Sequence, residues 1–302
     1  MVLLPPGQKA RTAAELRILM DRFDGLFADK CMPVLDDFAL RAGDVVIATY
    51  PKCGTTWMQQ IVHGLRSGGS MDFEEISLVV PWIESAALVG IDLHADQVAA
   101  PRAFKSHLPW SSLPRGGRNI FITRDPADVL VSYYHFRTGI YYEAGDIDIT
   151  DFANEFFLRE SWGNRYWDHL RGWWEVRERD DVLFLCFEDM KDDLRPIVAR
   201  VAEFCGIAAD DELIDLATEQ AGFAFMSAHG NQFDDGPTTR AFIQELGFPP
   251  TNTTKVRAGR VGDGRREVPE PLVAVLDEIW RTEIAGPLGF ASYGELRAAL
   301  AS

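Results

Sequence analysis

The stretch Val45-Val46-Ile47-Ala48-Thr49-Tyr50-Pro51-Lys52-Cys53-Gly54-Thr55-Thr56-Trp57 joins an apolar, β-branched run to a short turn that contains proline and glycine. An apolar helical pattern follows at Met58, Ile61, Val62 and Leu65. This order predicts a strand, a tight loop and the N-terminus of a helix. Such a junction aims several backbone N–H groups at one point, and the helix dipole adds positive potential there. The sequence therefore predicts an anion-binding loop at the end of a strand.

This loop differs from the G-x-x-x-x-G-K-[ST] loop that binds nucleoside triphosphates, because no lysine stands directly before Thr55 or Thr56. Its lysine is Lys52, two residues before Gly54, and an aromatic residue, Trp57, follows the threonines. Both differences argue against a nucleotide kinase, which stays the weaker alternative. They favour an anion that is held by a lysine ahead of the helix, with an aromatic surface behind it.

The composition limits the classes of partner. The chain has 302 residues, enough for one large α/β domain or two small ones. Its net charge is −16 and its pI is about 4.8, which disfavours a general attraction to nucleic acid or to an acidic membrane. A heavily sulfated or uronic-acid polymer is disfavoured for the same reason. Any anion must therefore be bound by a local cluster of basic groups.

Cysteine usage and hydropathy predict a reduced, cytoplasmic protein. No apolar run has the length of a membrane-spanning helix, and the N-terminus lacks the basic start of a signal peptide. The four cysteines form no C-x-x-C pair, and no clustered ligand spacing suggests a metal. Cys53 lies inside the predicted loop. A small residue that fills the turn is favoured there over a nucleophile, because no histidine is close in sequence.

Short apolar strands alternate with helical patterns along the chain. Strands are expected at 45–49, 102–105, 119–123 and 182–187, and helices at about 55–66, 126–137, 162–177 and 194–205. Nearly continuous apolar strands between helices predict a buried parallel sheet. We therefore expect a single α/β domain over residues 1–302, with a core of about 35–290, a central parallel sheet flanked by helices and a P-loop-like nucleotide-binding centre.

The segment from about 230 to 254 has a different composition. It is rich in glycine, proline and threonine, carries Phe233, Phe242 and Phe248, and is predicted to surround one short helix at 239–246. Long loops in compact domains are often lids, although a plain surface excursion fits this pattern almost equally well. The three phenylalanines favour a lid, because a purely solvated loop has little use for them.

A second basic stretch is Phe104-Lys105-Ser106-His107-Leu108-Pro109. In an extended backbone Lys105 and His107 project to the same side, because side chains alternate along a strand. A cation and a titratable imidazole then lie together. A histidine after a strand is usually solvated or satisfied in a core, so this pair gains weight only beside the anion loop.

The third stretch begins at Arg124, which follows the expected strand 119–123. Asp125 can cap the next helix, and Ser132 lies two turns into it, so a guanidinium and a hydroxyl can share a phosphate. Arg124 could instead pair with Asp125 or Asp128, and Ser132 could bond back to its own helix. A fourth stretch, from Lys255 to Asp263, sets basic residues between glycines, which would allow close approach to an anion.

In this order and at these separations, the four stretches resemble the cytosolic sulfotransferase family from about residue 35 to 290. The family's Tyr-Pro-Lys-[Ser/Ala]-Gly-Thr-Thr-Trp pattern is matched at Tyr50–Trp57 and its Lys-[Thr/Ser]-His-Leu-Pro pattern at Lys105–Pro109. Its Arg-[Asn/Asp]-Pro-x-Asp-x-x-[Val/Leu]-Ser-x-Tyr pattern is matched from Arg124 to Tyr134. Its Arg-Lys-Gly-x-x-Gly-Asp pattern is matched from Arg257 to Asp263, and residues 79–84 resemble its acceptor-pocket segment.

The resemblance implies sulfuryl transfer from 3′-phosphoadenosine 5′-phosphosulfate (PAPS) to a hydroxyl or amine of a small apolar acceptor, with adenosine 3′,5′-bisphosphate (PAP) as product and no metal. It implies His107 as general base, Lys52 at the leaving phosphate and Lys105 at the sulfuryl oxygens. The cofactor-binding set that it implies is Lys52, Cys53, Gly54, Thr55, Thr56, Trp57, Arg124, Ser132, Phe187, Phe223, Arg257 and Gly259. Of these, Trp57 and Phe223 would flank the adenine, and Arg124, Ser132 and Arg257 would hold the 3′-phosphate.

The chain also departs from the family pattern. Ala258 replaces a lysine beside Arg257, and Phe187 stands where the family often has a tyrosine. The family's dimerisation motif is not recognisable, which leaves the oligomeric state open. Aromatic residues could line an apolar acceptor pocket: Trp82, Trp110, Tyr133, Tyr141, Tyr142 and the three phenylalanines of 230–254. A carbohydrate or glycolipid acceptor, and a non-catalytic nucleotide-binding protein, are the alternatives.

Overall fold

The computed structural model describes residues 4–159, 165–248, 262 and 264–300. Within them lies a parallel sheet made of β1 (Val45–Thr49), β2 (Ala103–Ser106), β3 (Arg118–Thr123) and β4 (Val182–Cys186), in the order β2-β1-β3-β4. In β1, Val46 is in register with Phe104 of β2 and Asn119 of β3. The predicted single α/β domain with a central parallel sheet is confirmed, and each predicted strand lies within one residue of its observed bounds.

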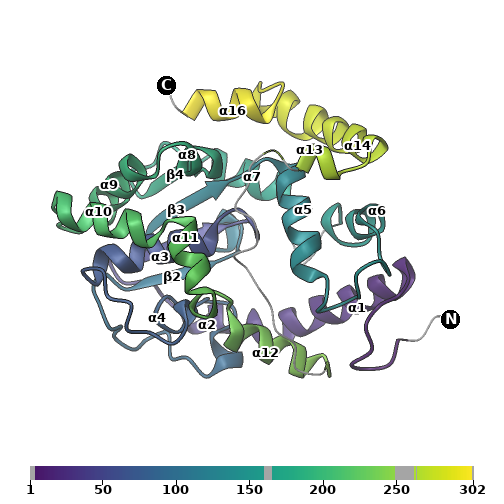
Figure 1. Ribbon diagram of the computed structural model, residues 1–302, viewed down its shortest axis with the longest axis horizontal. Helices are drawn as coiled ribbons and strands as arrows, with labels where there is room; N and C mark the ends of the chain where they lie inside the picture. Colours follow the sequence, from purple (N-terminus) through teal and green to yellow (C-terminus); the bar gives the residue numbers. More distant parts are fainter. Residues whose placement is uncertain (1–3, 160–164, 249–261, 263, 301–302) are drawn as a thin grey trace.

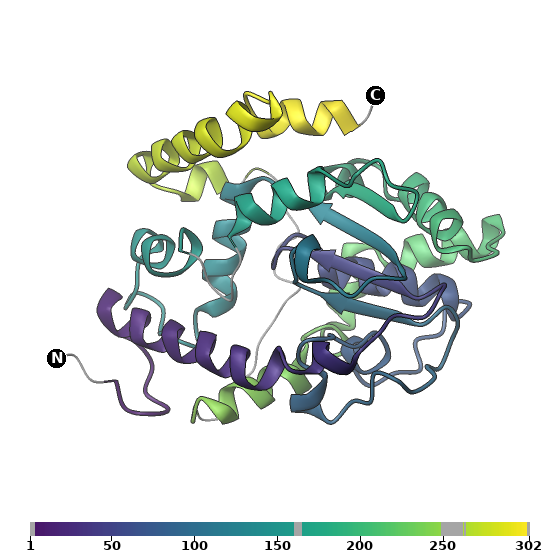
Figure 2. The same cartoon turned by 180° about the vertical axis from the view of Figure 1, so that it is seen from behind.

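Helices cover both faces of this sheet (Figures 1 and 2). The longer ones are α1 (Ala13–Leu26), α3 (Thr55–Arg66), α5 (Pro126–Arg137), α7 (Tyr166–Trp174), α9 (Leu194–Cys205), α10 (Asp211–Gln220), α12 (Gly236–Glu245), α14 (Glu270–Trp280) and α16 (Tyr293–Leu300). The shorter ones are α2 (Val34–Asp37), α4 (Ile76–Val79), α6 (Ile149–Phe152), α8 (Phe187–Asp192), α11 (Phe223–Ala228), α13 (Gly264–Glu267) and α15 (Gly286–Leu288).

The helices predicted at 55–66, 126–137 and 194–205 are confirmed with those bounds as α3, α5 and α9. The start of α5 follows the predicted chemistry, because Asp125 accepts hydrogen bonds from the N–H groups of Ala127 and Asp128 and proline occupies the first turn. The helix predicted at 162–177 is shorter, as α7. The one predicted at 239–246 begins earlier, as α12, because Gly236-Pro237 starts a helix there and does not continue the loop.

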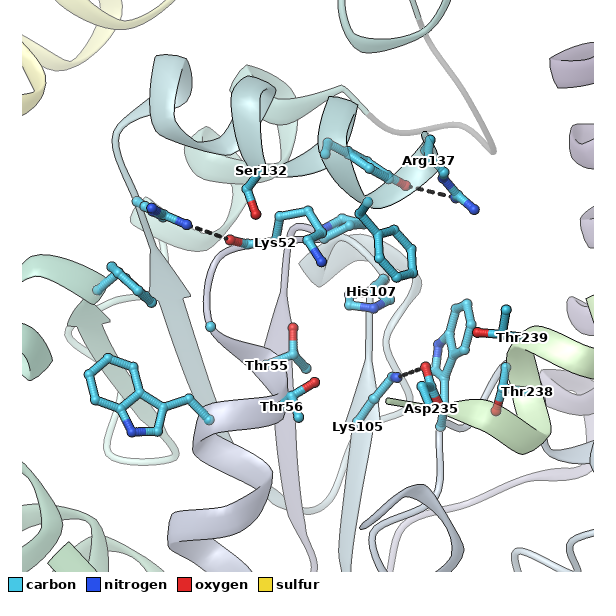
Figure 3. Close-up of a pocket in the computed structure, with 18 of the residues that line it drawn as sticks. Lys52, Thr55, Thr56, Lys105, His107, Ser132, Arg137, Asp235, Thr238 and Thr239 are labelled. Atoms are coloured by element: carbon cyan, nitrogen blue, oxygen red, sulfur yellow. Dashed lines mark hydrogen bonds and ion pairs between the residues drawn. The ribbon is translucent and has the colours of Figure 1, made fainter. Parts of the chain in front are cut away.

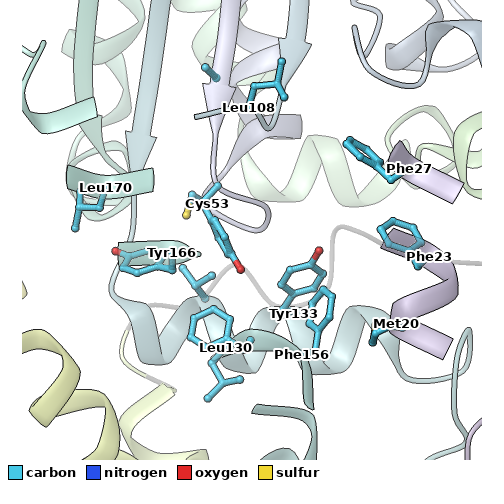
Figure 4. Close-up of a cluster of buried hydrophobic side chains, with 14 of the residues drawn as sticks. Met20, Phe23, Phe27, Cys53, Leu108, Leu130, Tyr133, Phe156, Tyr166 and Leu170 are labelled. Atoms are coloured by element: carbon cyan, nitrogen blue, oxygen red, sulfur yellow. The ribbon is translucent and has the colours of Figure 1, made fainter. Parts of the chain in front are cut away.

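The sheet divides the apolar core into two clusters. Val46 and Ala48 point into the cluster that contains α1, α5, α7 and α14, whereas Val45 and Ile47 point into the cluster that contains α3, α9 and α10. This alternation follows from the period of two in a strand. Figure 4 shows part of the first cluster, which includes Cys53, Tyr133 and Tyr166.

Two segments far apart in the sequence, α1 and α12, lie side by side along one edge of the molecule (Figures 1 and 2). The rings of Phe23 and Phe242 are 5.2 Å apart, and the Gly7 N–H donates to the Leu246 carbonyl at 3.1 Å. The carboxyl ends of β1, β2 and β3 meet at one edge of the sheet, since the strands are parallel. The loops that follow these strands therefore lie opposite α5, α1 and α12.

Candidate active site

The predicted anion loop forms the turn between β1 and α3. Gly54 is the N-cap of α3 with φ 107°, and Lys52 also has a positive φ, 74°. Positive φ is rare outside glycine, so the backbone at Lys52 is held in an unusual conformation by its surroundings. A Cβ on Gly54 would also come within 3.0 Å of the Phe187 ring. The hydroxyls of Thr49 and Thr55 lie 2.5 Å apart and tie the strand to the first turn of the helix.

Most of the predicted site residues line one cavity of about 240 Å³. From the predicted set, its walls include Lys52, Gly54, Thr55, Thr56, Trp57, Lys105, His107, Arg124, Ser132, Phe187 and Phe223. Figure 3 shows Lys52 and His107 directed into the same space from neighbouring strand ends, with Thr55 and Thr56 at the helix start beside them. Residues from five distant stretches of the chain thus converge on one cavity.

Cys53 does not line this cavity. Cys53 is fully buried, its N–H donates to the Tyr50 carbonyl at 3.3 Å, and burial raises the pKa of its thiol. It fills the turn, and its side chain faces Tyr166 and the core (Figure 4). Its place in the cofactor-binding set stays a prediction. Arg257 and Gly259, with Ala258 between them, lie outside the described residues.

His107 is oriented by two hydrogen bonds. Its backbone N–H donates to Glu84 Oε1 at 2.7 Å, and its Nδ1 lies 2.8 Å from the Thr49 carbonyl oxygen. A carbonyl oxygen can only accept, so Nδ1 carries the hydrogen, and in the neutral ring the lone pair is on Nε2. The edge of Trp82 packs against the imidazole at a ring distance of 5.1 Å. This is the tautomer that a general base with Nε2 as its acceptor requires.

Lys105 makes a buried ion pair with Asp235, 2.7 Å between Nζ and Oδ2. Asp235 is held by further bonds: Ser77 Oγ donates to its Oδ1 at 2.6 Å, and its own N–H donates to Glu75 Oε1 at 2.9 Å. The sequence analysis did not identify Asp235. Its position before α12 and its left-handed φ of 56° carry no chemical signal by themselves.

Arg124 makes one of the ion pairs that the sequence left open, with Asp128, and it also lines the cavity. Its guanidinium lies 3.5 Å from the carboxylate of Asp128 and 4.2 Å from the Phe187 ring centre. Asp128 in turn accepts the N–H groups of Gly262 and Gly264 at 2.9 and 2.7 Å. This carboxylate therefore anchors the end of the fourth basic stretch, at Gly262, and the adjoining Gly264 to α5. Among described residues, no hydrogen bond joins Ser132 Oγ back to its own helix.

Aromatic residues form a second wall near α3 and α8. The indole N–H of Trp57 donates to the Ala221 carbonyl at 2.7 Å, and its ring meets that of Phe187 edge-to-face at 5.3 Å. Phe223 lies at the cavity with 45% of its surface exposed. Such flat surfaces suit a planar heterocycle, because every base has a π-face that can stack.

The opposite end of the cavity is lined by α1, α5 and α12. Of the aromatic residues proposed for an acceptor pocket, Trp82, Tyr133, Tyr141 and Phe242 line it. Four others pack in the core instead: Trp110, Tyr142, Phe233 and Phe248. Other lining residues belong to none of the four predicted stretches, namely Phe23, Phe136, Arg137 and Ile140. Nothing in the local sequence pattern distinguishes these residues from those of an ordinary packed helix or turn.

The fold and the site together define a class: an α/β protein with an anion-binding loop, paired basic residues at strand ends and an oriented histidine. The chain belongs to the sulfotransferase domain family, whose model matches residues 42–287. It is 30% identical to the amine sulfotransferase of Oryctolagus cuniculus over 270 residues, which cover 86% of this chain and 87% of that protein. It is 29% identical to sulfotransferase 1C2 of Rattus norvegicus over 268 residues, or 83% and 86% of the two chains.

The fold is also similar to solved structures. Mouse sulfotransferase SULT7A1 complexed with PAP matches with a TM-score of 0.68 at 20% identity, covering 92% of this chain and 96% of that one. Retinol dehydratase in a complex with retinol and PAP matches with a TM-score of 0.67 at 21% identity and 85% coverage of both. Within the part of the chain that the structure describes, no cluster of three potential metal ligands occurs, and no helix is long and apolar enough to cross a membrane.

Proposed function

We propose that this sulfotransferase binds PAPS at the loop end of the cavity and a hydroxyl or amine acceptor at its aromatic end, with His107 as the general base. One observation carries the proposal. The Nδ1–H of His107 is bonded to the Thr49 carbonyl, in the same cavity as Lys52 and Lys105. A histidine whose tautomer is set in this way, beside two lysines at an anion loop, suits proton removal next to a developing negative charge.

The residues present fit the donor's charged groups. Lys52 and the first N–H groups of α3 would surround the 5′-phosphate, since a helix N-terminus favours an anion. Arg124 and Ser132 would hold the 3′-phosphate, and Trp57, Phe187 and Phe223 would contact the adenine. PAPS supplies an activated sulfuryl group when bound, and PAP is what remains after transfer.

In the proposed step, His107 takes the acceptor's proton at Nε2 while the acceptor oxygen forms its bond to sulfur. The bond from sulfur to the bridging oxygen breaks, and its electron pair stays on the phosphate. Lys52 and the loop N–H groups stabilise that charge, as in other in-line displacements. Lys105 would lie against the sulfuryl oxygens, sharing its charge with Asp235.

We also propose that the chain is one domain over residues 1–302, with a core of about 35–290, and that the segment 230–254 closes the acceptor end. Support comes from its described part, 230–248. Phe233 and Phe242 are buried there, Asp235 pairs with Lys105, and Thr238 and Thr239 line the cavity. These contacts disfavour a plain surface excursion.

Incubation with labelled PAPS and a panel of phenols, alcohols, amines and sugars tests the proposal. We expect transfer to at least one small acceptor that fits an aromatic pocket, and its loss in His107→Ala. Transfer only to carbohydrate or glycolipid acceptors would replace the small-acceptor part of the proposal. Phosphoryl transfer from ATP in place of sulfuryl transfer would support the kinase alternative.

A further inference from the structure

Arg137, the last residue of α5, is a buried cation at the acceptor end of the cavity. Its side chain is surrounded by aromatic rings, with guanidinium-to-centroid distances of 4.7 Å to Tyr141, 5.1 Å to Tyr133 and 5.2 Å to Phe23. Only 8% of its surface is exposed. Figure 3 shows Arg137 at the rim of the cavity that also holds Lys52 and His107.

Among the described residues, the four other buried cations each have a carboxylate or several strong carbonyl-type acceptors; Arg66 has the latter, donating to Gln97 Oε1 and to the Val79 and Pro101 carbonyls at 2.6–2.8 Å. Lys105 pairs with Asp235, Arg102 with Asp44, and Arg124 with Asp128. The hydrogen bonds of Arg137 within the described residues go instead to two phenols: Nη1 donates to Tyr141 Oη at 3.0 Å and Nη2 to Tyr133 Oη at 3.2 Å. Among those same residues, no carboxylate lies within ion-pair distance of its guanidinium.

The phenols do not supply the missing negative charge. Burial raises the pKa of both Tyr133 and Tyr141, so both are neutral at neutral pH. Each phenol oxygen accepts from Arg137 and keeps its own hydrogen, for which the described part of the chain provides no acceptor. Arg137 Nε is likewise buried without a hydrogen-bond partner there. Within the described part of the chain, the cluster therefore has donors in excess and one positive charge that no carboxylate neutralises.

A buried charge is costly unless an opposite charge or several hydrogen bonds compensate it. Arg137, Tyr133 and Tyr141 all line the cavity, so a compensating group can come from a ligand there. Cation–π contacts stabilise the guanidinium, but they provide no acceptor for the two phenol hydrogens. A carboxylate fits, because it accepts from a guanidinium fork and carries one charge against one. A phosphate dianion would bring a second charge into the same aromatic surroundings.

We infer that Arg137, with Tyr133 and Tyr141, binds a carboxylate on the acceptor, so that the preferred substrates have an aromatic or aliphatic body with a hydroxyl at one end and an acid at the other. This inference rests on the proposed function for the transfer step and specifies the acceptor class of that site. It makes Arg137 a specificity-determining residue.

The test uses matched pairs of acceptors: para-hydroxybenzoate, para-hydroxyphenylacetate and para-hydroxyphenylpropanoate, each beside its primary amide. The readouts are kcat/KM with PAPS and calorimetric binding of each compound to the PAP-loaded protein. At the best chain length we expect the acid to be preferred by about tenfold to a hundredfold, as for a hydrogen bond to a buried charge. Arg137→Met should bring the ratio of kcat/KM for the acid to kcat/KM for the amide close to one. Arg137→Lys should give a ratio between that value and the ratio of the unaltered protein.

Controls separate recognition from folding. Arg281→Met removes an exposed arginine outside the cavity and should keep the ratio of the unaltered protein. PAP-induced thermal stabilisation reports whether Arg137→Met is folded. If it is not, Tyr133→Phe and Tyr141→Phe, which delete only the hydroxyls, should each lower the ratio.

The outcomes distinguish carboxylate recognition by Arg137 from the proposed sulfuryl transfer on which it rests. Equal use of acid and amide at every chain length, or an unchanged ratio in Arg137→Met, would overturn the inference while leaving sulfuryl transfer intact. Arg137-dependent binding of the acid without any transfer would uphold the inference and contradict the proposed function. If the acid is neither bound nor sulfated at any length, the inference is wrong.

Discussion

Lys105 Nζ lies 2.7 Å from a carboxylate oxygen of Asp235, although 130 positions separate the two residues in the chain. The two side chains are only 2% and 7% exposed. The pair joins β2, which leads into His107, to the turn that starts α12. Displacing α12 from the cavity therefore requires separating a buried ion pair, and an anion in the cavity must share Lys105 with Asp235.

Asp235→Asn should lower the free energy of unfolding by about 3 kcal/mol or more, because it leaves the buried ammonium of Lys105 without its charged partner. Urea unfolding of the free protein measures this. Asp277→Asn, which breaks the exposed pair with Arg265, is the matched control and should change stability by less than about 1 kcal/mol. Equal, small effects from both substitutions would show that the Lys105–Asp235 pair does not hold α12 in place.

His107→Ala should reduce kcat by about 10²- to 10⁴-fold while PAP binding persists, because the imidazole serves the acceptor proton and not the nucleotide. Lys52→Ala should weaken both turnover and PAP binding, since the proposed function places Lys52 at the leaving phosphate. His135→Ala, which alters a histidine paired with Glu267 outside the cavity, should keep turnover. Near-normal turnover of His107→Ala with an aliphatic alcohol would exclude His107 as the base. If His107→Ala keeps turnover only with acidic phenols, His107 is not excluded as the base, because such phenols ionise without a general base.

PAP should raise the melting temperature more than AMP does, because the proposed function has Arg124 and Ser132 hold the 3′-phosphate that AMP lacks. A ligand that binds only the folded state stabilises it by roughly 2.7 kcal/mol at a hundredfold excess over its dissociation constant. Arg124→Met should bring the PAP shift down toward the AMP shift, and thermal unfolding with each nucleotide measures this. Identical shifts in melting temperature from PAP and AMP in the unaltered protein would show that it has no site for the 3′-phosphate.

Stability should fall in mild acid, in part through His63. Burial, with a smaller contribution from the charge of Arg66, lowers the pKa of His63 from 6.5 to about 4. The unfolded chain therefore binds a proton between these values that the folded chain does not, so this contribution is present above about pH 6.5 and is lost as the pH falls toward 4. The buried carboxyl of Glu84 acts in the opposite direction, because burial raises its pKa.

The variant His63→Gln isolates the contribution of His63 to the pH dependence of stability. Between pH 7.5 and pH 5 the unaltered protein should lose roughly 2 kcal/mol more stability than the variant, from the linkage between pKa and folding. Chemical denaturation at the two pH values gives the comparison. Parallel losses in the two proteins would mean that His63 titrates alike in the folded and unfolded chains.

The sequence by itself determined the parts of this protein that depend on local pattern. The run 45–49 reads as a buried strand, Gly54 supplies the left-handed φ at the helix start, and Asp125-Pro126 begins α5. Each is a property of a few consecutive residues, because strand period, turn conformation and capping are local. The same locality placed Lys52, His107 and Arg124 at strand ends, and parallel strands then bring those ends to one edge.

Only the tertiary structure decided what faces that edge. The partner of Lys105 comes from residue 235, and Arg137 lies at the cavity among rings of α1 and α5. It also showed that Cys53, inside the predicted loop, turns into the core, while Phe23, from a helix that carries no motif, lines the cavity. Which side of a helix meets a neighbour depends on contacts between residues far apart in the chain, as with the 130 positions between Lys105 and Asp235. Such contacts leave no periodic trace in the chain, so the acceptor end of the site emerges from packing alone.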